Sequence, residues 1–431
     1  MDAPSRATET LRVRCCVAGG GPAGMMLGFL LARAGVEVAV LEKHADFLRD
    51  FRGDTIHAST LEVMYELGLL EEFMQRPHQE FASLDGYIDD VRVTIADFSH
   101  LPTRCKFIAV TPQWDFLDFL AEHGRRYPGF HLRMQAEVTG LVREGGRVAG
   151  VRATTPDGPL EVRADLVVGA DGRGSTVRAQ AGLQVEDLGA PMDVLWMRIS
   201  RAATDPGQTL GHVESGRILI LIDRGDCWQC AYVIPKGSWN QVREQGLPAF
   251  RAEVARLEPF LADRMGELTD WTDVKLLTVR VDRLLRWHLP NLLCIGDAAH
   301  AMSPIGGVGI NLAVQDAVAA ARLLAGPLRR GSVTEAELEA VQRRREWPTR
   351  MTQRLQVLVQ ERTIRGVLNA GAAGPTELPL PIRLLRRWPR LARIPARIVG
   401  VGFRPEHVKG SVLERPLVAA VRRAGGASPV A

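Results

Sequence analysis

The stretch LRVRCCVAGGGPAG, residues 11–24, decides the fold. Residues 11–18 are mostly apolar and rich in β-branched side chains, which predicts a short strand, and the spacing of residues 22–34 predicts a helix directly after a glycine cluster. Gly35 ends that helix as a left-handed cap would. The almost wholly apolar residues 36–42 predict a second strand, buried on both faces as in a parallel sheet. Strand, helix and strand together form one βαβ unit.

A glycine fingerprint lies in the turn between that first strand and the helix. Gly19 permits the tight turn, Gly21 lets the backbone approach a pyrophosphate, and Gly24 lets helix and strand pack closely. The free amides and the dipole at the helix N-terminus favour a phosphate by about 0.3–1 kcal/mol. Glu42 ends the second strand about twenty residues further on, where a carboxylate binds ribose hydroxyls and disfavours a 2′-phosphate. The fragment therefore predicts a site for FAD or NAD, with candidate contacts Gly19, Gly21, Pro22, Ala23, Gly24, Glu42 and Lys43.

The size and composition of the chain predict a large globular protein of two to three domains. It has 431 residues, of which 46% are hydrophobic and 24% charged, against about 150 residues per domain. Its six cysteines are irregularly placed and too few for a disulfide scaffold. The N-terminus lacks the pattern of a secretory signal, and the apolar residues 24–32 are too few for a membrane span. We therefore expect a cytoplasmic protein that does not cross a membrane.

The charge of the chain is close to balance but unevenly distributed. A formal net charge of +4 gives no indication of a nucleic-acid partner. From residue 382 onward there are eleven Lys or Arg and two Glu, so this end carries +9 and residues 1–381 carry −5. We favour a solvated terminal helix as the interpretation. A weak peripheral contact with anionic lipid, at about 1 kcal/mol per basic residue near the surface, is the alternative.

Two further segments each contain a predicted strand that is followed by a short polar motif. Residues 166–175, LVVGADGRGS, indicate a buried strand that ends in Asp-Gly, and residues 293–304, LCIGDAAHAMSP, indicate another that ends in Gly-Asp. With these three motifs in this order, the chain resembles the class A flavoprotein monooxygenases, the para-hydroxybenzoate hydroxylase-like family, over residues 13–361. The resemblance implies an α/β fold: a Rossmann-like FAD-binding domain with an inserted, mostly antiparallel β-sheet substrate domain and a helical C-terminal segment.

The remaining patterns agree with this organisation. Strands are expected at residues 194–199, 218–222, 230–234 and 276–281. Helices are expected at residues 60–68, 116–123, 309–324 and 335–361. We expect an FAD-binding domain of residues 1–80, 103–189 and 282–361, a substrate domain of residues 81–102 and 190–281, and a basic helical segment of residues 362–431.

The Gly-Asp motif and the residues after it are implied to hold the flavin part of FAD. The resemblance makes Asp297 the acceptor of hydrogen bonds from the ribityl chain, since a buried carboxylate without donors would be costly. The residues after Pro304 lead into a helix whose amides can face the flavin pyrimidine and stabilise negative charge there. The common family pattern has Gln where this chain has Val308, so one side-chain hydrogen bond is expected to be missing.

Single residues outside the three motifs also resemble positions of the family. Arg52 resembles an arginine that reaches the FAD pyrophosphate, Gln113 a glutamine that touches the flavin, and Asp171 a residue that serves both FAD and a transient NADPH, with Arg178 as a weaker candidate. The FAD contacts implied by the resemblance are Arg52, Gln113, Asp171, Gly296, Asp297, Pro304, Gly307, Gly309, Ile310 and Asn311.

The resemblance also implies a reaction. NADPH reduces FAD, O2 adds to form a flavin C4a-hydroperoxide, and one oxygen is transferred to an aromatic or polycyclic small molecule. No protein nucleophile is needed and the sequence identifies no catalytic base; NADH as donor and the oligomeric state stay open. We expect the substrate between the flavin and the inserted sheet, near Trp196, Met197, Trp228 and Tyr232.

Two other functions remain as alternatives. One is a flavin-dependent reductase of a prenyl or other hydrophobic substrate, and the other is a non-catalytic escort protein that keeps the FAD fold. A halogenase is disfavoured, because only Ile234 and Pro235 echo its Trp-x-Trp-x-Ile-Pro element. Cys227 and Cys230 match C-x-x-C but lack a second pair, so we expect buried apolar cysteines and no metal site.

Overall fold

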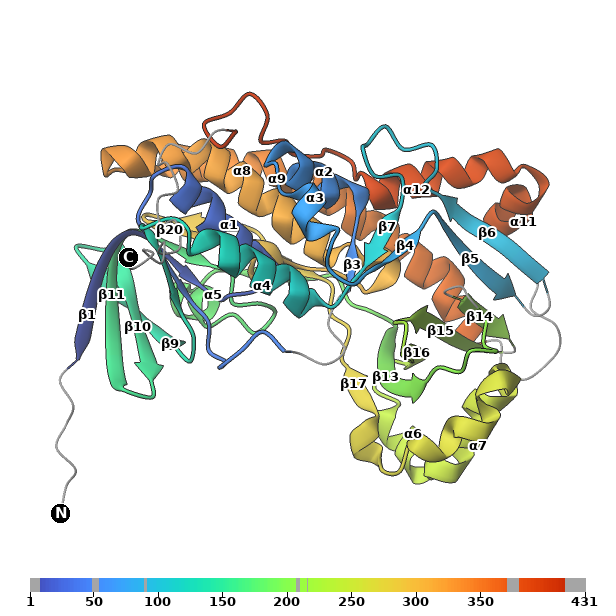
Figure 1. Ribbon diagram of the computed structural model, residues 1–431. Coiled ribbons are helices and arrows are strands. Elements are labelled where there is room, and N and C mark those ends of the chain that lie inside the picture. The colour runs from blue at the N-terminus through green and yellow to red at the C-terminus, as the bar shows by residue number, and fades with distance from the viewer. Residues whose placement is uncertain are drawn as a thin grey trace, which may run out of the picture.

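A computed structural model describes residues 8–48, 54–88, 91–206, 210–214, 216–369 and 380–414 (Figure 1). The larger sheet consists of β1 (Glu9–Ala18), β2 (Val38–Leu41), β8 (Phe130–Arg133), β9 (Glu137–Glu144), β10 (Arg147–Thr155), β11 (Gly158–Gly169), β19 (His288–Leu289) and β20 (Leu292–Cys294). Its order is β19-β20-β11-β1-β2-β8, with β10 beside β11 and β9 beside β10. Because β20, β11, β1, β2 and β8 are parallel, their carboxyl ends lie at one edge.

Long helices pack on this sheet. They are α1 (Pro22–Arg33), α4 (Gln113–Gly124), α8 (Gly309–Arg330) and α9 (Glu335–Val359), with α1 in contact with both α4 and α8 (Figure 1). A Cβ on Gly28 would lie 2.4 Å from the Val40 side chain, so this glycine lets α1 lie directly on β2. Within the described part of the chain, residues 305–330 are the one helix long and apolar enough for a membrane span, but 83% of its most apolar window is buried. This burial is typical of a core helix.

The second sheet takes its strands from two separate parts of the chain. They are β5 (Ser83–Ile88), β6 (Val91–Asp97), β13 (Met192–Ser200), β14 (Leu210–Glu214), β15 (Arg217–Asp223), β16 (Cys227–Pro235) and β17 (Lys275–Leu277). The order is β17-β13-β16-β15-β14-β5-β6, and the neighbours are antiparallel apart from β14 and β5. One face carries α6 (Trp239–Glu244), α7 (Leu247–Leu257) and the 3-10 helix η1 (Pro259–Glu267), away from α8 and α9 (Figure 1).

The opposite face of this sheet packs toward the turn that precedes α8. Val194 in β13 and Val233 in β16 share an apolar cluster with Ile305, which lies in the turn four residues before α8. Ile364 and Val367 join the same cluster from the end of the long helical rod that begins with α9. This apolar junction joins the second sheet to the turn before α8 and to the end of that helical rod.

Smaller elements complete the fold. Two three-stranded sheets are formed by β3 (Thr55–Ile56), β7 (Ile108–Val110) and β4 (Gln79–Phe81), and by β12 (Val185–Asp187), β18 (Asp282–Leu284) and β21 (His300–Ala301). The other helices are α2 (Ala58–Glu66), α3 (Leu70–Phe73), α5 (Thr176–Ala181), α10 (Arg365–Asn369), α11 (Leu380–Arg387) and α12 (Arg393–Gly400). Short 3-10 or π segments are η2 (Trp271–Asp273), η3 (Gly296–Ala298), η4 (Ile305–Gly307), η5 (Gln360–Ile364) and η6 (Pro389–Ala392).

The expected α/β fold class, with an inserted, mostly antiparallel sheet and a helical C-terminal segment, is confirmed. The differences are local. The helix expected at residues 309–324 continues to Arg330 and includes Pro327. The strand expected at residues 276–281 ends at Leu277, and the Val279 N–H instead donates to the Asp193 carboxylate at 3.0 Å. The buried side chain of Asp193 is thus satisfied by backbone that leaves the sheet.

Candidate cofactor site

The three sequence motifs follow three adjacent strands of the larger sheet. β11 lies between β1 and β20, with Gly169 opposite Ala18 on one side and opposite Cys294 on the other. The hydrogen bonds continue past the strands: the Ala170 N–H donates to the Ala18 carbonyl at 2.8 Å, and the Ile295 N–H donates to the Gly169 carbonyl at 3.0 Å. The structure therefore brings the glycine fingerprint, the Asp-Gly motif and the Gly-Asp motif to one edge.

The glycine fingerprint forms a tight turn with one open position. A Cβ on Gly19, which has φ +103°, would lie 2.4 Å from the Ala170 carbonyl oxygen, and a Cβ on Gly24 would lie 1.9 Å from the Gly19 carbonyl oxygen. Both glycines are therefore needed for the turn itself. A Cβ on Gly21 would meet nothing within 4 Å. Helix α1 begins at Pro22, and the first amides of a helix have no acceptor within it.

Glu42 orders the glycine turn. Its side chain is mostly buried, and Oε2 accepts a hydrogen bond from the Gly20 N–H at 2.9 Å. Its Oε1 accepts from the His44 N–H at 3.1 Å and lies 2.6 Å from His44 Nδ1. The neighbouring Lys43 is exposed. The expected contacts of Glu42 and Lys43 with a ribose or phosphate stay predictions.

Asp171 holds the loop that follows β11. Its Oδ1 accepts from the Ser175 hydroxyl at 2.5 Å and its Oδ2 accepts from the Val177 N–H at 3.0 Å, so the carboxylate fixes the start of α5. Arg178 is buried and pairs with Asp282 at 3.4 Å. Asp171 and Arg178 thus have hydrogen-bond or ionic partners within the protein. The expected contacts of these two side chains with FAD or NADPH stay predictions.

Gln113, at the start of α4, lies near the turn between β15 and β16 of the second sheet. Its backbone N–H donates to Asp54 Oδ1 at 3.3 Å, and Asp54 pairs with Arg224, from the turn between β15 and β16, at 3.3 Å. Burial raises the pKa of the Asp54 carboxyl, and the Arg224 guanidinium opposes this shift. Arg52, the expected pyrophosphate ligand, lies outside the described residues.

The Gly-Asp motif packs against the glycine fingerprint. A Cβ on Gly296, which has φ +58°, would lie 3.0 Å from the Ala23 Cβ and 3.5 Å from the Ala313 Cβ, so this turn touches the starts of α1 and α8. The carboxylate of Asp297 is 31% exposed and pairs with Arg173 Nε at 3.0 Å. Arg173 belongs to the loop after β11. The ion pair thus links two of the three motifs and leaves the carboxylate accessible.

The turn from Pro304 to α8 is joined to α2 by one side chain. Asn311 Oδ1 accepts from the His57 N–H at 2.8 Å and from the Thr60 hydroxyl at 2.7 Å. Its Nδ2 donates to the Thr55 carbonyl at 3.2 Å. The N-termini of α2 and α8 therefore meet here, and both helix dipoles favour negative charge in their neighbourhood.

The apolar side chain at Val308 has a structural explanation. Val308 packs with Met302 and Leu312, and Val399 of α12 lies against this cluster. Gly307, with φ +62°, precedes Val308, and Gly309 and Ile310 begin α8. Their backbone amides are placed at the helix start, as expected, while the Val308 side chain is directed to α12.

His57 is a buried imidazole beside the same turn. Its Nδ1 lies 2.8 Å from the Val399 carbonyl, which can only accept, so Nδ1 carries the proton and Nε2 is an acceptor. Within the described residues Nε2 has no hydrogen-bond partner, and a Cβ on Gly307 would lie 3.5 Å from it. Burial lowers the pKa of His57 to about 4, so the ring is neutral at pH 7.

A buried ionic network supports the Gly-Asp motif from behind. Asp316 on α8 accepts from the Gly296 N–H at 3.0 Å and contacts His300 Nε2 at 2.6 Å through Oδ2. Its Oδ1 accepts from Arg345 Nε, on α9, at 3.0 Å. Burial alone would raise the pKa of Asp316, but His300 and Arg345 outweigh it and hold the pKa below its ordinary value.

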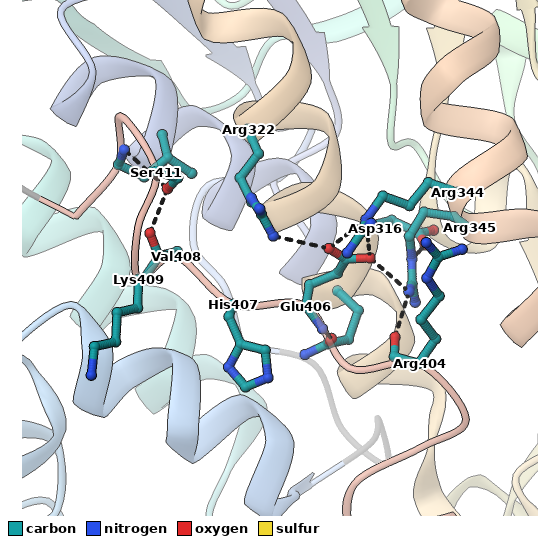
Figure 2. A network of polar contacts seen from close by, with 12 residues as sticks. Asp316, Arg322, Arg344, Arg345, Arg404, Glu406, His407, Val408, Lys409 and Ser411 are labelled. Atoms are coloured by element: carbon teal, nitrogen blue, oxygen red, sulfur yellow. Dashed lines mark hydrogen bonds and ion pairs between the residues drawn. The ribbon is translucent and has the colours of Figure 1, made fainter.

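The network continues into the C-terminal turn (Figure 2). Glu406 has no exposed side-chain surface, and both of its carboxylate oxygens accept from Arg344 Nε at 2.8 Å. Arg345 NH1 lies 3.4 Å and Arg322 NH1 3.5 Å from the same carboxylate. Arg345 therefore bridges Glu406 and Asp316, and it connects the C-terminal turn to the Gly-Asp motif.

The structure corrects the expected substrate contacts. Met197, Trp228 and Tyr232 belong to the core under α7 and η1, with exposed fractions of 0%, 0% and 7%. Trp228 also donates from Nε1 to Asp205 at 2.8 Å. Trp196 lies in the cluster on the other face, with Ile305. Of the four predicted side chains, only Trp196 faces the turn before α8, because successive residues of a strand point to opposite faces.

The cysteines form no second chemical centre in the described part of the chain. All six are free and buried, including Cys227 and Cys230, and burial raises the pKa of Cys16 to about 12 and that of Cys105 to about 11. Among the described residues there is no group of three His, Cys, Asp or Glu side chains that could hold a metal ion.

The arrangement fits FAD. The space at Gly21 admits the close approach of a pyrophosphate to the backbone, and a side chain there would occupy that space. The unmatched Nε2 of His57 would cost about 1–3 kcal/mol, and a donor from a bound group would relieve this cost. A family model described as an FAD binding domain matches residues 12–355 of the chain. The protein belongs to this family. It is an FAD-dependent monooxygenase of the para-hydroxybenzoate hydroxylase-like type.

Relatives of the monooxygenase agree with this assignment. It is 35% identical over 390 residues to 6-methylpretetramide 4-monooxygenase of Streptomyces rimosus, which covers 89% of this chain and 91% of that protein. It is 29% identical over 334 residues to 12-dehydrotetracycline 5-monooxygenase/anhydrotetracycline 6-monooxygenase of Streptomyces rimosus subsp. rimosus, covering 72% and 61%. The solved structure of PqsL from Pseudomonas aeruginosa with 2-aminobenzoylacetate shares the fold, with a TM-score of 0.70, 23% identity and coverage of 83% and 100%.

Sequence reasoning missed the residues that support the site. Asp316 could have been found, because a lone carboxylate within the apolar helix pattern of residues 309–325 requires buried partners. His57 and Glu406 had no such local signal. Their partners, Val399 and Arg344, are 342 and 62 positions away in the chain.

We predict that Gly21→Ala weakens FAD binding without unfolding the protein. The new Cβ meets no protein atom, so thermal stability should change by no more than about 0.5 kcal/mol, whereas FAD affinity should fall about tenfold or more. Gly24→Ala should instead destabilise the fold, since its Cβ would strike the Gly19 carbonyl. Titration of the apoprotein with FAD and thermal unfolding distinguish the two, with Gly140→Ala in β9 as a neutral control. Wild-type FAD affinity in Gly21→Ala would contradict the placement.

We predict that His57→Asn makes the protein less sensitive to acid. The ordinary pKa of His57 is 6.5 and the folded value about 4, so the unfolded chain binds the extra proton first, and stability is lost as the pH falls from 6.5 toward 4. At pH 4.5 the loss in the free energy of unfolding that His57 causes amounts to roughly 2–3 kcal/mol. The asparagine can keep the hydrogen bond to Val399 but cannot titrate. Denaturant unfolding at pH 7 and pH 4.5 measures the difference, and an identical loss in both proteins would refute the assignment.

We predict that Glu406→Gln destabilises the protein by about 3–5 kcal/mol, because three guanidinium groups, those of Arg322, Arg344 and Arg345, contact its buried carboxylate. FAD retention during gel filtration should fall with it, since Arg345 also holds Asp316. Glu339→Gln, an exposed glutamate on α9, is the control and should change stability by less than about 0.5 kcal/mol. Equal unfolding temperatures for the two variants would show that the Glu406 network does not contribute this free energy to the stability of the fold.

Proposed function

We propose that the protein hydroxylates a fused polycyclic aromatic substrate with O2 and a reduced nicotinamide, NADPH in preference to NADH. The observation that carries the proposal is the 35% identity to 6-methylpretetramide 4-monooxygenase across 91% of that enzyme. The second tetracycline-type relative supports the same substrate class. Six free, buried cysteines agree with action in the reducing cytoplasm.

The residues of the chain have separate tasks in this function. Bound FAD supplies the electron transfer and oxygen activation. The α1 N-terminus next to Gly21 binds the pyrophosphate, the accessible carboxylate of Asp297 accepts hydrogen bonds from the ribityl hydroxyls, and the amides at Ile310 and Asn311 face the pyrimidine ring. The joined N-termini of α2 and α8 stabilise negative charge that develops there.

The apolar junction between the second sheet and the turn before α8 suits the substrate. Trp196, Val194 and Val233 of the second sheet face Ile305, which leads into the flavin-facing turn, and Val367 closes the same cluster. Fused aromatic rings gain about 25 cal/mol for each Å² of apolar surface removed from water. The same surface excludes water from the reacting atoms. We therefore place the substrate rings against Trp196, beside the turn that holds Ile305.

A labelled-oxygen experiment tests the reaction. The purified protein is loaded with FAD and incubated with NADPH, a panel of fused polycyclic phenols and 18O2, and the products are analysed by mass spectrometry. The proposal expects substrate-dependent O2 consumption and a product that carries one labelled oxygen atom. Product formation without O2 would favour the reductase. Lack of any FAD reduction by NADPH or NADH would favour the escort protein.

We predict that two tryptophans of the second sheet behave differently. Trp196→Ala should raise the KM for the polycyclic substrate about tenfold, since an aromatic contact is lost, with a smaller loss of stability than Trp228→Ala because Trp196 is only partly buried. Trp228→Ala should destabilise the fold by about 3–5 kcal/mol, because its fully buried side chain lies under η1. Steady-state kinetics and thermal unfolding of both variants check this. A normal KM in Trp196→Ala would remove that residue from the substrate site.

A further inference from the structure

The C-terminal helices present a row of exposed apolar side chains. Residues 380–400, which we call the basic helical surface, comprise α11, η6 and α12. Leu380, Leu384 and Trp388 are exposed by 63%, 36% and 54%, and Ile394 by 58%. The Trp388 N–H donates to the Leu384 carbonyl at 2.8 Å, so the α-helical turn continues and the first three side chains, four residues apart, follow one helix face. Large apolar side chains aligned in this way are uncommon on a solvated helix.

The charged side chains of the same segment are all positive. Residues 380–400 contain six arginines and no Asp or Glu. Arg393 contacts Asp97 and His100. The other five, for which no ion pair is found in the described part of the chain, are Arg383, Arg386, Arg387, Arg390 and Arg397. A solvated helix face would usually carry acids to pair with these arginines.

The position of the surface leaves it open to a planar partner. The inner sides of α11 and α12 pack against β6, and Ala396 and Gly400 are buried. Figure 1 shows α11 at one end of the molecule, beside β6. Residues 380–400 carry +6, which leaves −2 for the rest of the chain with its formal net charge of +4, so an anionic surface would attract this segment and not the rest of the protein. The charge distribution therefore fixes an orientation as well as a contact.

We propose that the basic helical surface docks the protein onto an anionic lipid bilayer. Arginines beside a row of leucine and tryptophan are the composition of a helix that lies in the membrane interface, with its apolar side chains at the acyl boundary and its cations at the headgroups. An acidic partner protein would usually require a shaped groove for the apolar row, whereas a bilayer accommodates a convex helix. The contact is peripheral and reversible, because one short helix supplies it.

Vesicle sedimentation with the full chain tests the proposal. Large vesicles of phosphatidylglycerol and phosphatidylcholine in equal parts should bind the protein, and pure phosphatidylcholine vesicles should not. Each arginine near an anionic surface contributes about fivefold to partitioning, so the triple variant Arg386→Glu, Arg387→Glu, Arg390→Glu should lose about a hundredfold or more. Leu384→Ser, compared with the wild type, should weaken vesicle binding more at high salt than at low salt. High salt screens the attraction between the arginines and the lipid headgroups, so that the apolar contact supplies more of the remaining binding.

A charge-matched variant distinguishes the effect of the basic helical surface on vesicle binding from the effect of the protein's net charge. Arg125→Glu, Arg329→Glu, Arg354→Glu changes three exposed arginines elsewhere and alters the net charge by the same amount. It should keep vesicle binding within about threefold, since these residues lie outside the basic helical surface. Equal loss in both triple variants, or no binding of the wild type to anionic vesicles, would overturn the proposal. Binding to polyglutamate but not to vesicles, lost only in the first variant, would also overturn it and indicate an acidic protein as the partner.

Discussion

The buried carboxylate of Asp316 is the constraint on which the rest of the site depends. A charge removed from water must be matched by partners at hydrogen-bond distance, and removing one partner of such a set usually costs several kcal/mol. The partners of Asp316 come from the turn after β20, from β21 and from α9: Gly296, His300 and Arg345. Satisfying this one carboxylate therefore fixes the relative positions of the strand tip, the core helix and the helix that leads to the C-terminal segment.

The local parts of the site were predictable from the sequence, and the parts that depend on distant contacts were not. Gly19, Gly21 and Gly24 act within one turn, so their spacing alone indicates the turn and the open backbone. Glu406 depends on Arg344 and Arg345, which are 62 and 61 positions away. No periodicity relates such positions. The same limit applies to Val308, whose side chain is explained only by the packing of α12, a helix that the sequence could not place.

The second sheet shows a different limit of sequence reasoning. Alternation distinguishes an inner from an outer face only when one face is polar. In β16 eight consecutive residues, Cys227 to Ile234, are buried, because helices cover one face and the apolar junction covers the other. The pattern therefore predicted a strand correctly but could not assign Trp228 or Tyr232 to a face. Only the packing of α7 and η1 makes that assignment.

The burial of every thiol has a consequence for the chemistry of this FAD-dependent monooxygenase. Oxidation of cysteine and reaction with electrophiles proceed through the thiolate. With all six sulfurs enclosed and the pKa of Cys16 and Cys227 raised to about 12 and 11, almost no thiolate exists at neutral pH. The folded enzyme is thereby shielded from inactivation by stray peroxide, and a single cysteine introduced on its exterior would react alone with a maleimide probe.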